Sequence, residues 1–265
     1  MRVIRYLDRD GYACFGLEAA VDRVVSATTR DFPPREFAGE PGVPSKRLPP
    51  IAPPNIIAIG RNYREHAAEM KATSQESEPL IFLKATSSVI GPHDPIVLPT
   101  SAPSEVDFEA ELGVVIGHVA KDVPSNRALE YVFGYTCAND VSARDCQKRR
   151  DKQWARGKSF DTFCPVGPVI VTSDEIDPGN LPIRSILNGR VMQESNTSEM
   201  IFSVAELVSY VSHQFTLLPG TLILTGTPGG VGAARTPPVF LRPGDEICIE
   251  IEGIGRLTNH VIAAL

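Results

Sequence analysis

The chain of 265 residues contains 42% hydrophobic and 22% charged residues, which is typical of one large globular domain and excludes disordered, collagen-like and coiled-coil proteins. Its 26 Lys and Arg residues against 32 Asp and Glu residues give a net charge of −6, which disfavours nucleic acid and anionic membranes as partners. Five cysteines without a Cys-x-x-Cys pair indicate neither a disulfide framework nor a zinc site. With no apolar signal segment and no run of about 18 apolar residues, the sequence predicts a cytoplasmic protein.

The N-terminal part of the chain contains short strand-like runs and then a proline-rich segment. Residues 33–54 include eight prolines, which lack the backbone N–H that helices and sheets need. We therefore expect this segment to run extended over the surface as a spacer. The predicted organisation is a small N-terminal subdomain with its Pro-rich linker at residues 1–52, followed by a larger domain at residues 53–265.

A short helix is predicted close to the start of the larger domain. Asn62 and Glu65 have the spacing of an N-cap and its capping-box partner, which predicts a helix over residues 63–70. In this helix His66 and Glu69, three residues apart, share a face, so the carboxylate orients the imidazole. A surface ion pair is the alternative interpretation.

An acidic strand is predicted at residues 106–112, where apolar and acidic residues alternate. A strand places Asp107, Glu109 and Glu111 on one face, about 6.5 Å apart along the chain, so these carboxylates repel one another unless water or a cation intervenes. A solvated sheet face is one interpretation. The apolar run that continues over residues 113–116 favours a strand that enters the interior, where carboxylates require a partner.

A fourth carboxylate follows the next apolar run, residues 133–139. Asp140 is placed to complete the cluster, and an all-oxygen set suits Mg²⁺, Mn²⁺ or Ca²⁺ better than Zn²⁺. Asp140, Arg144 and Gln147 have the spacing of one face of a helix beginning at Asp140, so they are expected to converge on one ligand. A salt bridge between Arg144 and Asp140 is the alternative.

The C-terminal half carries strand, hairpin and helix signals. Asn188-Gly189 predicts a type I′ hairpin turn, and residues 251–257 predict a second hairpin. Ser203 and Glu206 form a capping box ahead of an amphipathic helix. Short Val- and Ile-rich runs outnumber helices, so the predicted fold class is mixed α/β and predominantly β.

Two further segments have a composition that bears on function. The Gly-rich loop at residues 226–232 lacks the ending of a P-loop and is interpreted as a turn that lines a cavity. The basic run at residues 148–152 is short and interrupted by an acid, which favours a solvated loop over a lid above an anionic substrate.

Several motifs together resemble the fumarylacetoacetate hydrolase family, within its subgroup of small acylpyruvate hydrolases and 2-hydroxyhepta-2,4-diene-1,7-dioate isomerases. The resemblance covers about residues 53–262 and is carried by D-F-E-A-E-L-G (107–113), N-D-V-S-A-R-D-C-Q (139–147), G-K-S-F-D-T-F-C-P-V-G-P (157–168), I-G-R-N-Y-R-E-H-A-A-E (59–69) and L-T-G-T-P-G-G-V-G (224–232). It implies a β roll or barrel with a metal in its mouth, usually in a homodimer.

The resemblance also implies roles for individual residues. It assigns a divalent metal, with Mg²⁺ as first candidate and Mn²⁺ or Ca²⁺ as alternatives, to Glu109, Glu111 and Asp140. Catalysis is assigned to His66, Glu69 and Lys158, and substrate binding to Lys84, Arg144, Gln147 and Thr227.

The resulting hypothesis is that the protein is a metal-dependent hydrolase. It cleaves the C–C bond of a small 2-oxo acid substrate, a 2,4-dioxo acid of the acylpyruvate or fumarylpyruvate type, to give pyruvate and a carboxylic acid. Water activated by His66 attacks, and the metal stabilises the departing enolate. The alternative is decarboxylation of an oxaloacetate-type acid, or isomerisation of a 2-oxo-enoate in aromatic catabolism, at the same site. A metal nuclease or a non-catalytic binding protein is less favoured, given the net charge of −6 and the lack of an E-x-K element.

Overall fold

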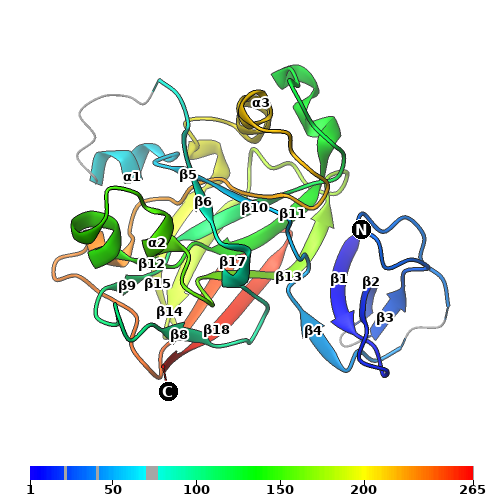
Figure 1. Cartoon of the computed structure of the whole chain (residues 1–265), viewed down its shortest axis with the longest axis horizontal. Coiled ribbons are helices and arrows are strands. Elements are labelled where there is room, and N and C mark those ends of the chain that lie inside the picture. The colour runs from blue at the N-terminus through cyan, green and yellow to red at the C-terminus, as the bar shows by residue number, and fades with distance from the viewer. Residues whose placement is uncertain (21–22, 40–41, 70–76, 265) are drawn as a thin grey trace.

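Two open β-sheets form the body of the protein in a computed structural model that describes residues 1–20, 23–39, 42–69 and 77–264 (Figure 1). The large sheet has the strand order β3 (Arg23–Ser26), β2 (Ala13–Ala20), β1 (Arg2–Leu7), β13 (Cys164–Thr172), β11 (Val132–Asn139), β10 (Ala110–Ile116), β16 (Leu222–Leu224), β5 (Ile56–Gly60) and β6 (Leu80–Lys84). Two short strands join it at its side, β4 (Lys46–Leu48) on β1 and β7 (Val89–Ile90) on β13.

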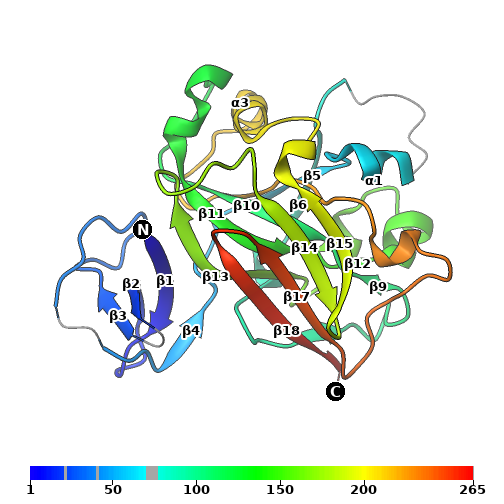
Figure 2. The same cartoon turned by 180° about the vertical axis from the view of Figure 1, so that it is seen from behind.

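The second sheet faces the viewer in Figure 2, with the order β15 (Arg190–Asn196), β14 (Pro182–Leu187), β17 (Glu246–Ile251), β18 (Gly255–Ala263) and β8 (Ile96–Leu98). A separate pair is formed by β9 (Val106–Asp107) and β12 (Ser142–Ala143). The mixed, predominantly β class is confirmed. Of the two forms that the resemblance implies, a roll or a barrel, the closed barrel is not formed, because the sheets of the described strands stay open.

The helices are short and few in the described ranges. The α-helices are α1 (Arg64–Glu69), α2 (Ala155–Lys158) and α3 (Val204–Gln214), the 3₁₀-helices are η1 (Thr86–Ser88), η2 (Ser125–Tyr131), η4 (Thr197–Glu199) and η5 (Gly232–Ala234), and η3 (Cys146–Arg150) is a π-helix. None of the described helices has the length and apolarity needed to cross a bilayer.

Local sequence signals account for the best-predicted elements. Ser203 and Glu206 form the complete capping box ahead of α3, as predicted. Asn188 and Gly189 both have positive φ, 50° and 78°, which is the type I′ geometry predicted for the turn between β14 and β15. The C-terminal hairpin is also confirmed, as β17 pairs antiparallel with β18.

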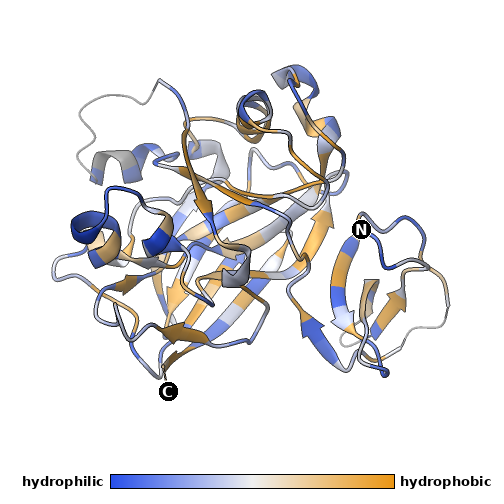
Figure 3. Cartoon of the chain, viewed as in Figure 1, coloured by the Kyte–Doolittle hydropathy of each residue, from blue (hydrophilic) through white to orange (hydrophobic). Residues whose placement is uncertain are grey.

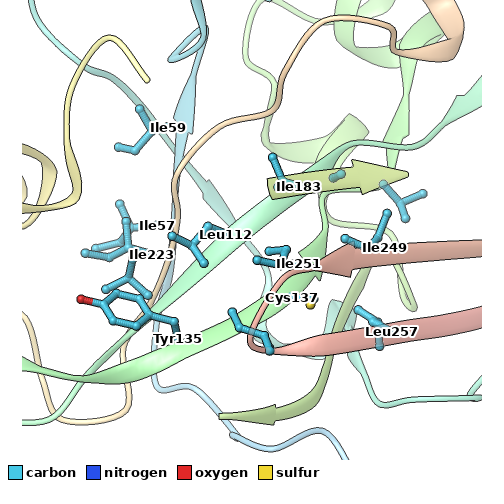
Figure 4. Close-up of a cluster of buried hydrophobic side chains, with 14 of the residues drawn as sticks. Ile57, Ile59, Leu112, Tyr135, Cys137, Ile183, Ile223, Ile249, Ile251 and Leu257 are labelled. Atoms are coloured by element: carbon cyan, nitrogen blue, oxygen red, sulfur yellow. The ribbon is translucent and has the colours of Figure 1, made fainter. Parts of the chain in front are cut away.

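The core lies between the two sheets. Leu112 and Cys137 of the large sheet belong to the same buried cluster as Ile183, Ile251 and Leu257 of the second sheet (Figure 4). Each fully buried aliphatic side chain of this kind contributes about 1.5–3 kcal/mol. Packing against the second sheet therefore fixes the strands β10 and β11, which carry the candidate site.

The N-terminal strands lie to one side of the body in both views (Figures 1 and 2). The expectation that the proline-rich segment forms no sheet hydrogen bonds is wrong, because its proline-free stretch Lys46–Leu48 pairs with β1 as strand β4. β1 also pairs with β13 and so belongs to the large sheet. The domain division at residues 52 and 53 stays a prediction.

The acidic segment is less regular than the sequence predicted. Instead of one strand with two distinct faces, β9 ends at Asp107 and β10 starts at Ala110, and residues 106–112 are buried on both sides. β9 pairs with β12, which follows Asp140, and this extended pairing rules out the predicted helix beginning at Asp140. Helical backbone forms only from Arg144 and continues as η3 from Cys146, and the exposed basic residues of η3 make it hydrophilic in Figure 3.

Candidate metal centre and cavity

Three carboxylates predicted to bind a metal converge in the structure. The antiparallel pairing of β10 with β11 sets the start of β10 beside the end of β11, so Glu109 and Glu111 lie next to Asp140. All three are buried, and one oxygen from each lies within 4.8 Å of the others. This placement matches the prediction for the cluster.

Two buried lysines neutralise part of this charge. Lys158 Nζ donates hydrogen bonds to Glu109 Oε2 at 2.7 Å and to Asp140 Oδ2 at 2.6 Å. Lys84 Nζ donates to Asp140 Oδ1 at 2.5 Å and to the carbonyl oxygen of Lys158. Burial by itself lowers the pKa of Lys158, but Asp140 and Glu109 outweigh it and raise the pKa, so Lys158 is an ammonium ion and a hydrogen-bond donor.

The carboxylates differ in their protonation. Burial by itself raises the pKa of Glu109, but the charges of Lys158 and Arg144 outweigh it and hold the pKa below its usual range. For Glu111, burial and the neighbouring Asp140 and Glu109 raise the pKa well above its usual value. The nearby cations therefore do not compensate the negative charge of an ionised Glu111.

A divalent cation fits this environment. The charged cluster consists of the triad of Glu109, Glu111 and Asp140 and the buried charged side chains paired with it or with Arg144. It contains four carboxylates and three cations, with a formal charge of −1: Asp107, Glu109, Glu111, Asp140, Lys84, Arg144 and Lys158. Oxygen is the donor that hard cations such as Mg²⁺ prefer, and burial makes the uncompensated negative charge costly. The donor set of Glu109, Glu111 and Asp140 therefore fits a metal of the predicted kind.

Arg144 and Gln147 both line the cavity, in agreement with the predicted shared ligand, but Arg144 pairs with two acids other than Asp140. Its guanidinium donates to Asp107 Oδ2 from Nε at 2.9 Å and from Nη2 at 2.7 Å, and Nη2 lies 2.7 Å from Glu109 Oε1. The alternative of a salt bridge to Asp140 is wrong. Gln147 Oε1 accepts from Arg144 Nη1 at 2.9 Å, so the amide NH₂ is the group Gln147 offers to a ligand.

His66 and Glu69 come together on α1, as predicted. His66 Nδ1 lies 3.6 Å from Glu69 Oε2, which is a close contact slightly longer than a hydrogen bond. The nearby imidazole and a hydrogen bond from Gly230 N hold the pKa of Glu69 below its usual range. A carboxylate only accepts hydrogen bonds, so it favours the imidazole tautomer with the proton on Nδ1 and leaves Nε2 as the basic nitrogen.

The predicted capping box of α1 is wrong. Asn62 Oδ1 accepts from Phe202 N at 2.8 Å, and Asn62 Nδ2 donates to the carbonyl oxygens of Phe202 and Thr225. The amide thus ties the start of α1 to Phe202, just before α3, and to Thr225, just before the Gly-rich loop. The helix spans Arg64–Glu69, and the predicted end at Met70 lies outside the described residues.

The Gly-rich loop holds three acidic side chains through its backbone. Gly226 N donates to Glu111 at 2.8 Å, Gly230 N donates to Glu69 at 2.9 Å, and Gly232 N donates to Asp107 at 2.8 Å. Gly226 has φ of 97°, and a Cβ there would lie 2.8 Å from Asn62 Cβ. The sequence predicted a turn that lines a cavity, and the loop also orients carboxylates.

Thr227 of this loop faces the cavity with a fixed hydroxyl. Its Oγ1 donates to the carbonyl oxygen of Ala110 at 2.9 Å and accepts from Gln193 Nε2 at 2.7 Å. Gln193 Oε1 in turn accepts from Ala110 N at 3.0 Å. Gln193 was not predicted, because nothing local in the sequence indicates that a glutamine of β15 reaches the site.

The cavity combines predicted and unpredicted residues. It is lined by Ile59, Gly60, Arg61, His66, Phe82, Glu109, Glu111, Arg144, Gln147, Trp154, Lys158 and Thr227. Trp154, Phe82 and Arg61 were missed, although Trp154 is the single tryptophan of the chain and packs edge-on against Phe82 at 5.5 Å. Lys84 does not line the cavity, so the structure does not support its predicted substrate contact and makes it a counter-ion of Asp140.

Comparisons with known proteins show what the chain is similar to. The family model described as "Fumarylacetoacetate (FAA) hydrolase C-terminal" matches residues 55–262. The chain is 48% identical to the mitochondrial oxaloacetate tautomerase Fahd2a of Rattus norvegicus over 81% of this chain and 68% of that protein. It is 51% identical to the fumarylacetoacetate hydrolase domain-containing protein 2 homolog of Dictyostelium discoideum, over 80% of this chain and 72% of that protein.

Solved structures show the same fold over the whole chain. The 5-carboxymethyl-2-hydroxymuconate delta-isomerase of Mycobacterium smegmatis is 42% identical, with a TM-score of 0.86 and complete coverage of both chains. The 2-hydroxyhepta-2,4-diene-1,7-dioate isomerase of Mycobacterium marinum is 42% identical, with a TM-score of 0.85, over 99% of this chain and 98% of that one. The chain therefore belongs to the fumarylacetoacetate hydrolase family.

Proposed function

We propose that the protein is a cation-dependent isomerase that interconverts the keto and enol forms, or shifts the adjacent double bond, of a small 2-oxo dicarboxylic acid. The observation that carries this proposal is the buried triad of Glu109, Glu111 and Asp140 beside the ammonium group of Lys158. The names of the similar proteins support this alternative over the hydrolase hypothesis, since they are an oxaloacetate tautomerase, a 5-carboxymethyl-2-hydroxymuconate isomerase and a 2-hydroxyhepta-2,4-diene-1,7-dioate isomerase.

Different residues of the cavity have different roles in the proposed proton transfer. His66, oriented by Glu69, takes the proton from the carbon next to the 2-oxo group at its Nε2 atom. Lys158 Nζ and the amide of Gln147 donate hydrogen bonds to the oxygen on which negative charge develops. Transfer of this proton from His66 to that oxygen gives the enol, and its transfer to a conjugated carbon gives the shifted isomer.

Glu109, Glu111 and Asp140 are the residues that would hold the cation. When bound, a divalent cation supplies Lewis acidity that polarises the 2-oxo group and makes the neighbouring C–H bond more acidic. Gly226 N keeps Glu111 in position for this role by its hydrogen bond.

The first prediction concerns activity and its dependence on the cation. The protein is expected to accelerate the loss of enol absorbance of oxaloacetate at least about a hundredfold over Mg²⁺ alone, a size typical of general acid–base catalysis. Chelation with EDTA removes this acceleration and added Mg²⁺ restores it. Pyruvate is measured in the same samples to separate tautomerisation from decarboxylation. A rate equal to the protein-free baseline for oxaloacetate and for muconate-type 2-oxo-enoates would contradict the proposal.

Hydrolysis of an acylpyruvate remains a second candidate, favoured by the His66–Glu69 pair, which is placed to activate water. This candidate gives the second prediction. If His66 activates water, His66→Gln abolishes pyruvate release from acetylpyruvate. Pyruvate release from oxaloacetate, which needs no attacking water, falls much less. Equal losses of the two activities would contradict this division of labour.

The cytoplasmic location and the homodimer predicted from the sequence remain proposals. The related oxaloacetate tautomerase carries "mitochondrial" in its name.

A further inference from the structure

Asp107 is a buried acid to which the proposed reaction gives no role. Its side chain is fully buried. Oδ1 accepts hydrogen bonds from Phe108 N at 2.9 Å and Gly232 N at 2.8 Å, and Oδ2 accepts from Ala233 N at 3.0 Å. Oδ2 also accepts both hydrogen bonds from Arg144 described above. The carboxylate is thus held on one side by the backbone and binds a guanidinium on the other.

Arg144 is the connection between Asp107 and the proposed cation site. Its Nη2 atom lies 2.7 Å from both Asp107 Oδ2 and Glu109 Oε1, so the two acids share one positive charge. Without the charge of Asp107, Arg144 would neutralise Glu109 alone. Glu109 would then be a poorer ligand for a cation, because a guanidinium and a divalent ion compete for the same carboxylate.

We propose that Asp107 is a positioning residue of the cation site, which sets the affinity for a divalent cation by holding Arg144 and balancing its charge. This inference rests on the proposed cation-dependent function. It predicts that affinity follows the formal charge of the cluster, which is −1 in the wild type, 0 in Asp107→Asn, −2 in Arg144→Gln and −1 in the double variant.

The experiment is calorimetric titration of the full-length protein with Mn²⁺ and with Mg²⁺ in the absence of substrate. One buried charge acting on a doubly charged ion changes affinity by at least about tenfold at an effective permittivity near 20. Asp107→Asn is therefore expected to bind the cation at least about tenfold more weakly, and Arg144→Gln more tightly than wild type. The double variant returns to within about threefold of the wild type.

A matched control removes one acid outside the cluster. Asp145 accepts from Cys146 N and pairs with Arg150 at 3.0 Å, so Asp145→Asn is expected to bind the cation with wild-type affinity. A purely structural role for Asp107 predicts that the double variant binds as weakly as Asp107→Asn, or more weakly. If Asp107→Asn does not fold, tighter binding by Arg144→Gln still supports the proposal, since misfolding does not raise affinity.

Two outcomes separate this inference from the proposed function. If the wild type binds Mn²⁺ but Asp107→Asn binds it equally well, or Arg144→Gln binds it more weakly, the role of Asp107 is refuted and the proposed function stands. If the wild type binds neither cation, the proposed function fails and the inference fails with it.

Discussion

Replacing Asp140 with asparagine is expected to abolish cation binding and to lower the free energy of unfolding of the cation-free protein by about 3–5 kcal/mol. Asp140 is fully buried and accepts from Lys84 at 2.5 Å and from Lys158 at 2.6 Å. Its neutralisation leaves two buried ammonium groups beside fewer carboxylates, and a cation would add to this positive charge. Denaturant unfolding gives the stability, and calorimetric titration with Mn²⁺ gives the affinity.

A second substitution tests whether the loss of stability in Asp140→Asn arises from the unpaired charges of the two lysines. Lys84 has its ammonium group on Asp140 and lies outside the cavity, so Lys84→Met removes one of the two stranded charges without altering the cavity lining. The double variant Asp140→Asn with Lys84→Met is expected to recover at least about half of the lost stability. If the two substitutions destabilise additively, the buried ion pair is not the cause and the account given for Asp140 is wrong.

The parts of the site that were predicted depend on short-range pattern. Glu109 and Glu111 stand two residues apart on a chain segment that continues into an apolar strand, and Asp140 ends the next apolar run. Neighbouring runs of this kind pair readily as antiparallel strands, which brings the three carboxylates together. The His66–Glu69 pair was predicted for a similar reason, because three residues along a helix define a shared face.

The parts that were missed depend on contacts between distant segments. Asp107 was grouped with the other two acids by alternation, yet the break after β9 turns it toward Arg144 and the backbone of Gly232 and Ala233. Asn62 fits a capping box locally, but its amide is used by Phe202 and Thr225. Sequence pattern does not show that these distant partners are available to Asp107 and Asn62. Hydrogen bonds to them therefore replaced the local arrangements that the sequence predicted.

The N-terminal strands show that the same limit of local sequence pattern applies to the fold. Proline density correctly marks where the chain leaves the first strands, but it does not show that three residues without proline, Lys46–Leu48, find a partner in β1. The antiparallel pairing of β1 with β13 joins residues about 170 positions apart, such as Arg2 and Val171. A hydrophobic pattern identifies such strands but does not select the neighbour of each one.

Replacing Lys158 with methionine is expected to separate catalysis from cation binding. Lys158 is buried and protonated, and its ammonium group donates to two members of the triad, to Asp140 at 2.6 Å and to Glu109 at 2.7 Å. Its loss changes the formal charge of the cluster from −1 to −2, so the cation binds at least as tightly as in the wild type. The turnover number kcat at saturating Mg²⁺ falls by about 10²–10³, because the ammonium group no longer donates a hydrogen bond to the developing oxyanion.

The measurement is kcat for enol loss together with Mn²⁺ affinity, compared with Lys152→Met, which removes an exposed lysine of the nearby basic run and is expected to leave both quantities unchanged. Weaker cation binding in Lys158→Met would mean that Lys158 organises the carboxylates and does not compete with the ion for them. An unchanged kcat would remove Lys158 from the reaction and assign stabilisation of the oxyanion to Gln147 and the cation alone. Only a fall in kcat with retained affinity agrees with an ammonium group that acts on the substrate.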